Sequence, residues 1–334
     1  MEISLLSPFD AHLHLRDGEL LATTVPASSE TFAGAMVMPN LKPSVTTPQM
    51  AAGYKERILA HAHSGFEPYM TLFLTPQTTP ELIEAAAGSI LAMKLYPSGV
   101  TTHSEGGITA WDDPKLDAVL CKMAELGIPL SIHGETEGFV LDREAEFAPL
   151  YAQLAERHPD LKIMMEHIST KALSILLDTY ENLYATITLH HLLFTLDDLL
   201  GGMLNPHLFC KPILKRPEDR DALRSLAFGG HPKVMFGSDS APHPLSSKEC
   251  GKGAAGIFTA PLALAKLTEL FAEHNALAQL QSFVSTNAQR IYGLSLPEKR
   301  VILRNEPWTM PAQYGTVVPM LAKESLGWKV AGVE

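Results

Sequence analysis

The sequence predicts a (β/α)8 barrel with a C-terminal extension. Eight short apolar segments alternate with helix-like segments, and the apolar segments are continuous, as in parallel strands covered on both faces. Polar residues that can bind metals or move protons follow several of these segments. Because the active sites of such barrels form at the C-terminal ends of the strands, we expect these residues to meet at one mouth.

Strands and helices account for most of the chain. The predicted strands are Leu6–Leu13, Ala33–Met38, Tyr69–Leu74, Ile90–Tyr96, Pro129–His133, Lys162–His167, Tyr184–Leu189 and Lys233–Ser238. The predicted helices include Gln49–His63, Pro80–Ala87, Leu116–Glu125, Phe147–Arg157, Thr170–Tyr180 and Pro217–Ala227. Since a barrel needs about 250 residues, we expect one domain over residues 1–293 and an extension over residues 294–334 that packs on it.

Composition excludes several classes of protein. The 334 residues include 26 Lys and Arg against 37 Asp and Glu, and the net charge of −11 argues against binding to nucleic acid or anionic membranes. No apolar segment approaches the roughly 18 residues of a membrane span, and the N-terminus does not resemble a signal peptide. Cys121, Cys210 and Cys250 are widely separated, which indicates neither disulfides nor a cysteine zinc site. We expect a cytoplasmic protein.

His12 and His14 close the first predicted strand. Residues two apart in a strand point to the same side, so both imidazoles can hold one ion. The same spacing in His61-Ala62-His63 falls near the end of a predicted helix, where the two side chains diverge and cannot easily chelate. The alternative for His12 and His14 is a pair of hydrogen-bonded core histidines.

Lys94 lies within an apolar segment that otherwise predicts a buried strand. Burial of a free ammonium costs several kcal/mol or lowers its pKa far below about 10.4. A neutral amine there could capture CO2 as a carbamate, an anionic ligand able to bridge two cations. The alternatives are a lysine whose amine reaches solvent at the strand's end, or one paired with a carboxylate.

Three further residues follow predicted strands. His133 and His167 each end a strand, and either a metal ligand or a core histidine fits them. Asp239 ends an apolar strand abruptly, so it suits a general acid and base or a metal ligand. The alternative is an aspartate that caps the following turn.

Other patterns lack the context that a site requires. Gly251–Gly256 matches G-x-G-x-x-G, but no strand leads into it, so we expect a flexible loop near the mouth and no dinucleotide site. No phosphate-binding G-x-x-x-x-G-K-[ST] motif occurs. His190 and His191 are adjacent, and adjacent strand residues point to opposite faces, so we expect at most one of them to line the mouth.

The motifs around these residues closely resemble those of dihydroorotases, and more narrowly the shorter bacterial class of that family, within the amidohydrolase superfamily. The resemblance covers most of the chain, and the motifs keep the family's order. They are His12-Leu13-His14-Leu15-Arg16-Asp17-Gly18, Met38-Pro39-Asn40, Lys94-Leu95-Tyr96-Pro97, His133-Gly134-Glu135, Glu166-His167-Ile168 and Gly237-Ser238-Asp239-Ser240-Ala241-Pro242-His243.

The resemblance implies two zinc ions per subunit and usually a homodimer. The implied ligands are His12, His14 and Asp239 for the first ion, His133 and His167 for the second, and Lys94, carbamylated by CO2 to N6-carboxylysine, as the bridge between them. The implied substrate contacts are Arg16, Asn40, Thr101, Thr102, His133, Lys211, His243 and Ala255, of which Thr101 and Thr102 belong to a lid over residues 98–107.

The implied reaction is the reversible cyclisation of N-carbamoyl-L-aspartate to L-dihydroorotate plus water, in the de novo synthesis of pyrimidines. Two zinc ions activate a hydroxide and polarise the carbonyl, and Asp239 transfers the proton to the ring nitrogen. The nearest alternative is an amidohydrolase for hydantoins, dihydropyrimidines or allantoin. An inactive scaffold barrel is the alternative from another class, and the presence of all six metal positions argues against it.

Two positions depart from the family pattern. Lys211 stands where relatives carry leucine, which places an added cation near an anionic ligand. Leu189 and His190 stand where relatives typically show Pro-Gln, which bears on the backbone after the seventh strand. Neither departure touches the predicted metal ligands.

Overall fold

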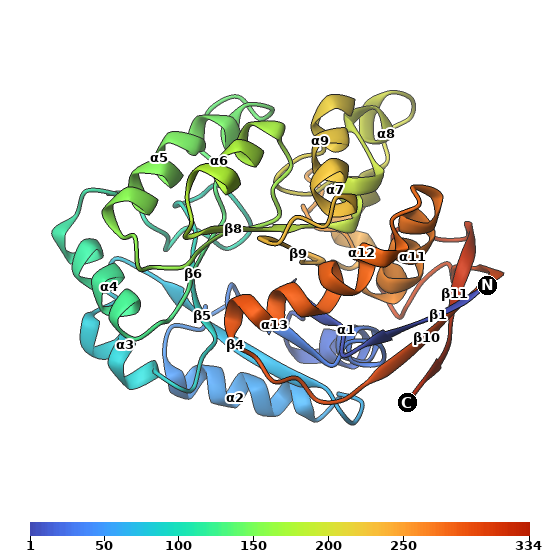
Figure 1. Ribbon diagram of the computed structural model, residues 1–334, viewed down its shortest axis with the longest axis horizontal. Coiled ribbons are helices and arrows are strands. Elements are labelled where there is room, and N and C mark those ends of the chain that lie inside the picture. The colour runs from blue at the N-terminus through green and yellow to red at the C-terminus, as the bar shows by residue number, and fades with distance from the viewer.

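The computed structural model describes residues 1–334 and contains a barrel of eight parallel strands (Figure 1). In pairing order the strands are β2 (Phe9–Leu13), β3 (Gly34–Val37), β4 (Glu67–Leu74), β5 (Ala92–Leu95), β6 (Leu130–Ile132), β7 (Ile163–Met165), β8 (Leu183–Ile187) and β9 (Val234–Phe236). A parallel bridge between Leu13 and Ser240 joins the first of them to the segment after the last. The predicted fold class is confirmed.

Helices cover the outside of the barrel (Figure 1). They are α1 (Leu21–Ser29), α2 (Pro48–Leu59), α3 (Pro80–Ala86), α4 (Pro114–Glu125), α5 (Arg143–Arg157), α6 (Ser174–Thr179), α7 (Leu189–Leu193), α8 (Leu196–Leu200), α9 (Pro217–Phe228), α10 (Leu245–Lys248), α11 (Ala263–Glu273), α12 (Leu277–Gln281) and α13 (Asn287–Tyr292). No helix is both long and apolar enough to cross a membrane.

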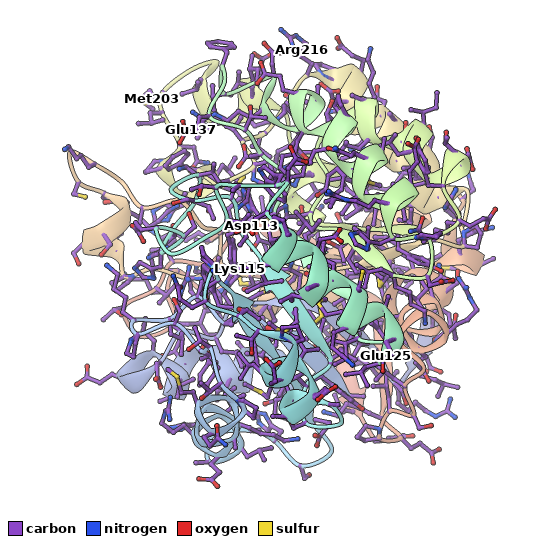
Figure 2. The ribbon with its side chains drawn as sticks, turned by 90° about the vertical axis from the view of Figure 1, so that its left-hand side faces the viewer. Asp113, Lys115, Glu125, Glu137, Met203 and Arg216 are labelled. Atoms are coloured by element: carbon purple, nitrogen blue, oxygen red, sulfur yellow. The ribbon has the colours of Figure 1, made fainter.

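Helix α4 illustrates how the sequence determines where an outer helix starts and which of its faces is buried. The Asp113 side chain accepts a hydrogen bond from the Lys115 amide, and a proline follows at the first helical position, as is usual at helix starts. The buried side chains recur at the spacing of one helical face, which packs on the barrel; they are Leu116, Val119, Leu120 and Met123. Figure 2 shows this helix on the outer surface, with Lys115 at one end and Glu125 at the other.

The inside of the barrel is filled beneath the mouth. Interior side chains from five strands pack with Ala288 and Ile291 of α13, and they are Phe9, Ala11, Met36, Met38, Ala92, Met164 and Met235. Since strand residues two apart share a face, Lys94 and Tyr96 continue inward from Ala92. The apolar layer therefore leaves only the C-terminal ends of the strands open for polar side chains.

A second, three-stranded sheet brings the two ends of the chain together (Figure 1). It consists of β1 (Glu2–Leu6), β10 (Arg300–Thr309) and β11 (Ser325–Val333), all antiparallel. The single strand predicted over Leu6–Leu13 is therefore wrong at its start. The chain turns at Ser7, whose φ is 43°, so Leu6 belongs to β1. The domain boundary at residue 293 stays a prediction.

The seventh barrel strand also ends earlier than predicted. β8 stops at Ile187, and the Thr188 hydroxyl accepts a hydrogen bond from the His191 amide at 3.1 Å, which begins the short helix α7. His190 and His191 therefore lie in a helix, and both are buried. The strand assumed for this pair is therefore wrong, but the expectation that at most one of the two lines the mouth is met, since neither lines the cavity.

Candidate metal centre and substrate cavity

His12, His14 and Asp239 meet at the junction of β2 and β9. The Asp239 amide donates to the His12 carbonyl at 2.9 Å, which holds the two segments together. Asp239 Oδ1 lies 3.1 Å from His14 Nε2 and 3.6 Å from His12 Nε2, and the two imidazole nitrogens are 3.3 Å apart. All three side chains are buried. Two nitrogens and a carboxylate oxygen at this spacing fit a divalent metal ion.

His133 and His167 form a second pair beside the first. They follow β6 and β7, and His133 Nδ1 lies 3.1 Å from His167 Nε2. The ring of His167 is also 4.9 Å from the ring of His12, so the two groups of ligands adjoin. His167 Nδ1 is buried without a hydrogen-bond partner. The five side chains thus form one continuous cluster.

Lys94 lies beneath this cluster as an unpaired buried amine. Its side chain is fully buried, and Nζ has no hydrogen-bond partner and lies 4.9 Å from the centre of the Tyr96 ring. Burial lowers the pKa of Lys94 to about 8, against the opposing charges of Glu166 and Asp239. At pH 7 such an amine is about 10% neutral, against less than about 0.1% for a free lysine.

Burial also favours the neutral form of His12, His14 and His167. It lowers the pKa of His12 to about 4, and it lowers the pKa values of His14 and His167 well below their usual range. Neutral imidazole is the form that binds metals, so these three side chains are ready to accept an ion at neutral pH. The imidazole and carboxylate ligand atoms, together with the unpaired nitrogens of Lys94 and His167, fit a pair of metal ions.

Two carboxylates that were not predicted as site residues form hydrogen bonds with two of these histidines. Glu166 Oε2 lies 2.7 Å from His12 Nδ1, and Glu135 Oε2 lies 2.6 Å from His133 Nε2. A carboxylate on the far nitrogen fixes the orientation of a ligating imidazole. Glu135 could have been found by its spacing, since it lies two residues after His133.

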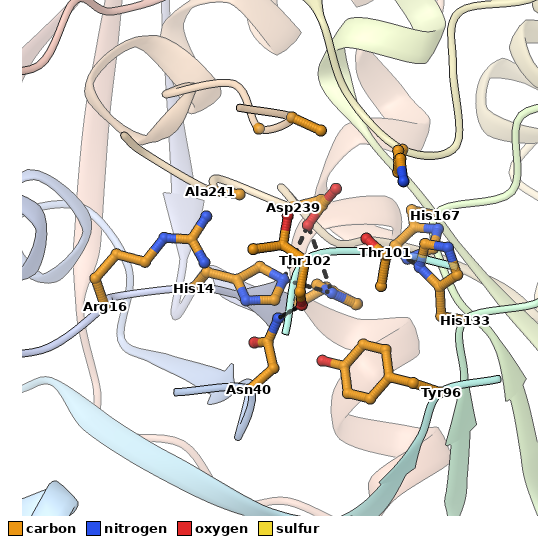
Figure 3. A pocket seen from close by; sticks show the side chains of 14 residues that line it. His14, Arg16, Asn40, Tyr96, Thr101, Thr102, His133, His167, Asp239 and Ala241 are labelled. Atoms are coloured by element: carbon orange, nitrogen blue, oxygen red, sulfur yellow. Dashed lines mark hydrogen bonds and ion pairs between the residues drawn. The ribbon is translucent and has the colours of Figure 1, made fainter. Parts of the chain in front are cut away.

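A small cavity opens beside the cluster. Its volume is about 30 Å³, and its lining comprises His12, His14, Arg16, Asn40, Tyr96, Thr101, Thr102, His133, His167, Lys211, Asp239, Ala241, Ala255 and Gly256. Figure 3 shows Arg16 on one side of it and His133 with His167 on the other, with Asp239 between them. Tyr96, Ala241 and Gly256 were not predicted as site residues. Tyr96 could have been, because it lies two residues beyond Lys94.

Two predicted residues do not reach the cavity wall. Lys94 lies beneath the histidines, and His243 stands behind Arg16, with its Nε2 3.0 Å from Arg16 Nη2 and 3.0 Å from the Ala255 carbonyl oxygen. The Arg16 Nε also donates to the Pro242 carbonyl at 2.9 Å. His243 therefore contacts the Arg16 side chain and the segment that carries Ala255.

Two side chains bind the segment that the resemblance predicts as a lid. Asn40 Nδ2 donates to the Thr102 carbonyl at 3.1 Å, and Lys211 Nζ donates to the Val100 carbonyl at 2.8 Å. The cavity has room for about two water molecules. Lys211, one of the two departures from the family pattern, is thus one of the groups that hold the segment down.

A model of the amidohydrolase family matches residues 9–294. The chain therefore belongs to the amidohydrolase family.

Comparison with individual proteins narrows this assignment. The chain is 46% identical to the dihydroorotase of Helicobacter hepaticus, over 98% of this chain and 97% of that protein. The crystal structure of dihydroorotase from Campylobacter jejuni superposes with a TM-score of 0.94 at 47% identity, covering 99% of this chain and 98% of that one. The Saccharomyces cerevisiae dihydroorotase in complex with 5-fluoroorotic acid gives 0.92 at 32% identity, covering 98% of each chain. Within the amidohydrolases, the chain belongs with the dihydroorotases.

Proposed function

We propose that the chain catalyses the reversible cyclisation of N-carbamoyl-L-aspartate to L-dihydroorotate plus water, with two zinc ions per subunit. The observation that carries the proposal is that the histidine–aspartate cluster and the Arg16 guanidinium line one cavity. A ring that presents an amide carbonyl to the cluster and a carboxylate to Arg16 fits this arrangement.

We assign the ligands of each ion from the side chains that lie close together. His12, His14 and Asp239 would hold one ion and His133 with His167 the other. Lys94 would bridge them after its neutral amine adds to CO2, which forms an N–C bond and releases one proton. The metal ions, when bound, lower the pKa of a water and polarise the carbonyl.

Asp239 is the residue that we assign to proton transfer. Burial raises the pKa of the Asp239 carboxyl, and the charge of His12 opposes this shift. A carboxylate beside the reacting atoms suits a group that accepts and returns a proton. Asp239 takes the proton from the attacking water as the C–O bond forms. It then gives that proton to the ring nitrogen as the C–N bond breaks, and the synthetic direction reverses both transfers.

Arg16 and its neighbours bind and orient the substrate. A guanidinium binds a carboxylate through two parallel hydrogen bonds. Asn40 and Ala255 line the same cavity as Arg16, and His243 contacts the Arg16 side chain and the Ala255 carbonyl. Thr101 and Thr102 close over the ring and exclude water, and Lys211 adds a positive charge at the same wall. These contacts favour a ring that bears a carboxylate over an uncharged hydantoin or dihydropyrimidine.

The remaining assignments rest on the family. We propose a cytoplasmic homodimer without a nucleic-acid or membrane partner, in which residues 294–334 are an extension packed on the barrel of residues 1–293. The strongly negative net charge of the chain supports the absence of polyanionic partners.

The test is turnover of the zinc-loaded protein on L-dihydroorotate and on dihydrouracil, which lacks the carboxylate. We expect turnover of dihydroorotate to N-carbamoyl-L-aspartate, and kcat/KM for dihydrouracil lower by at least about 10³, because the partly buried Arg16 guanidinium would be left without a carboxylate partner. Preference for dihydrouracil would contradict the substrate assignment. No turnover of either ring by metal-loaded protein would favour the inactive scaffold.

A further inference from the structure

A second cluster of possible metal ligands lies outside the cavity. It comprises His190 and His191 of α7 and Cys210, which precedes Lys211 in the chain. All three are buried, with 0%, 3% and 1% of their surface exposed. They offer ligand atoms that all lie within 4.8 Å of one another, and the two imidazole rings are centred 4.5 Å apart. None of the three belongs to the metal cluster at the mouth.

His190 is the unusual member of this group. Both of its ring nitrogens are buried and have no hydrogen-bond partner. A neutral imidazole carries one N–H donor and one acceptor, and leaving either of them unpaired in the interior is unfavourable. His191 differs, because its Nδ1 lies 2.8 Å from the Thr188 hydroxyl and its Nε2 lies 3.1 Å from the Pro212 carbonyl oxygen. The structure therefore leaves one buried imidazole without any group to bind.

The donor types define the ligand that would satisfy His190. Two imidazoles and a thiolate suit a borderline cation of the zinc class, at about 2.0–2.1 Å from nitrogen and 2.3 Å from sulfur. The Pro212 carbonyl oxygen lies 3.1 Å from both Cys210 Sγ and His191 Nε2, so it is a candidate fourth ligand. Tetrahedral coordination requires the three side chains to draw together by less than about 2 Å.

We propose that His190, His191 and Cys210 form a third metal site, structural in role, for a zinc-class divalent cation. On binding, the Cys210 S–H bond is replaced by a sulfur–metal bond and the proton passes to solvent, so the thiolate offsets one of the two positive charges. The ion would tie the segment of Cys210 to the end of β8. Because Lys211 follows Cys210 and holds the lid segment, the site would also fix one wall of the cavity.

Cobalt substitution tests the proposal through a signal that the mouth cannot produce. A cobalt–thiolate bond gives a charge-transfer band in the near ultraviolet, and the proposed mouth ligands contain no sulfur. Protein in which Co²⁺ replaces zinc is compared with Cys210→Ser and His190→Gln variants, and His61→Ala serves as the matched control at an exposed histidine. Metal per subunit is measured on the same samples.

We expect the band in the parent protein and in His61→Ala, with three ions per subunit. Cys210→Ser should lose the band and one ion, and His190→Gln should weaken both, while the two ions at the mouth remain. Absence of the band from the fully loaded parent would overturn the proposal, and so would a band that persists in Cys210→Ser. The measurement on the parent protein tests the third site even where a variant fails to fold. If the third site is disproved, the reaction proposed at the mouth is unaffected.

Discussion

Two His-x-His pairs in this chain share a spacing and differ in every other respect. His12 and His14 are buried at the end of β2 and meet Asp239 Oδ1 within 3.6 Å. His61 and His63 are exposed and follow α2, which ends at Leu59, so the predicted helix to residue 63 is too long. His63 Nδ1 lies 3.1 Å from the Ser29 hydroxyl, and no carboxylate completes a metal site there.

The comparison shows what turns a common spacing into a site. A strand end directs two imidazoles to one side, a neighbouring strand brings a carboxylate to the same point, and burial removes the water that would compete for the ion. The segment after α2 supplies none of these. Substitution of Asp239, the carboxylate beside His12 and His14, should therefore reduce activity severely. Substitution of His61 and His63 should leave activity unchanged.

The largest effect is expected from Asp239→Ala, which removes the group that distinguishes the first pair. We expect kcat to fall by about 10²–10⁴-fold, since a general acid and base contributes this much, while the far-ultraviolet circular dichroism stays unchanged. Asp239→Asn is the matched control for shape, and it should lose activity to a similar degree. Near-normal kcat in either variant would remove Asp239 as the proton carrier.

A smaller effect is expected from Arg16→Lys, two residues beyond the same pair. Lysine keeps the charge but cannot make the two parallel hydrogen bonds to a carboxylate or retain the geometry of the bonds to Pro242 and His243. We expect KM to rise by about tenfold, or roughly 1.4 kcal/mol, with a smaller change in kcat. Steady-state kinetics on dihydroorotate measures both, and parental values would refute the carboxylate role.

A still smaller effect is expected from Lys211→Leu, in the lining of the same cavity. The change removes the hydrogen bond to the Val100 carbonyl and one positive charge near the anionic substrate. Since a partly exposed bond of this kind is worth about 1 kcal/mol, we expect KM to rise about two- to fivefold with kcat within about twofold. Lys211→Met controls for side-chain length and should behave like leucine. An unchanged KM in both would leave Lys211 without a role in binding.

No effect on activity is expected from the double variant His61→Ala/His63→Ala. The side chains of the exposed pair contribute one hydrogen bond, to Ser29, so the free energy of unfolding should fall by no more than about 1 kcal/mol. The number of bound metal ions and the kinetic constants should match the parent protein. A loss of one ion would mean that spacing alone suffices for binding.

The sequence predicted the barrel and the cluster at its mouth because both follow from local patterns. Continuous apolar segments mark the strands. His12 lies near the end of its strand, and His133 and His167 follow theirs, and the C-terminal ends of the strands meet in any such barrel. The strand start at Phe9 was missed because β1 is selected by pairing with β10, nearly three hundred residues away. The end of β8 was missed because the Thr188 cap competes with an apolar pattern that continues into α7.

The carboxylates behind the histidines needed the structure for a different reason. Glu166 precedes His167 in the chain but supports His12, which comes from a strand across the barrel. Only the closed fold brings the two together. Cys210 and His190 present the same difficulty, since neither residue is informative until the segments after β8 and before Lys211 lie side by side.

The most direct test of the binuclear centre is the electron density at Lys94 in a crystal structure of the active, zinc-loaded protein. The account predicts a carboxylated side chain whose two oxygens lie between two ions about 3.5–4 Å apart, held by the histidines and Asp239 described above. A bare Lys94 amine, in crystals whose dissolved protein retains full turnover, would contradict it.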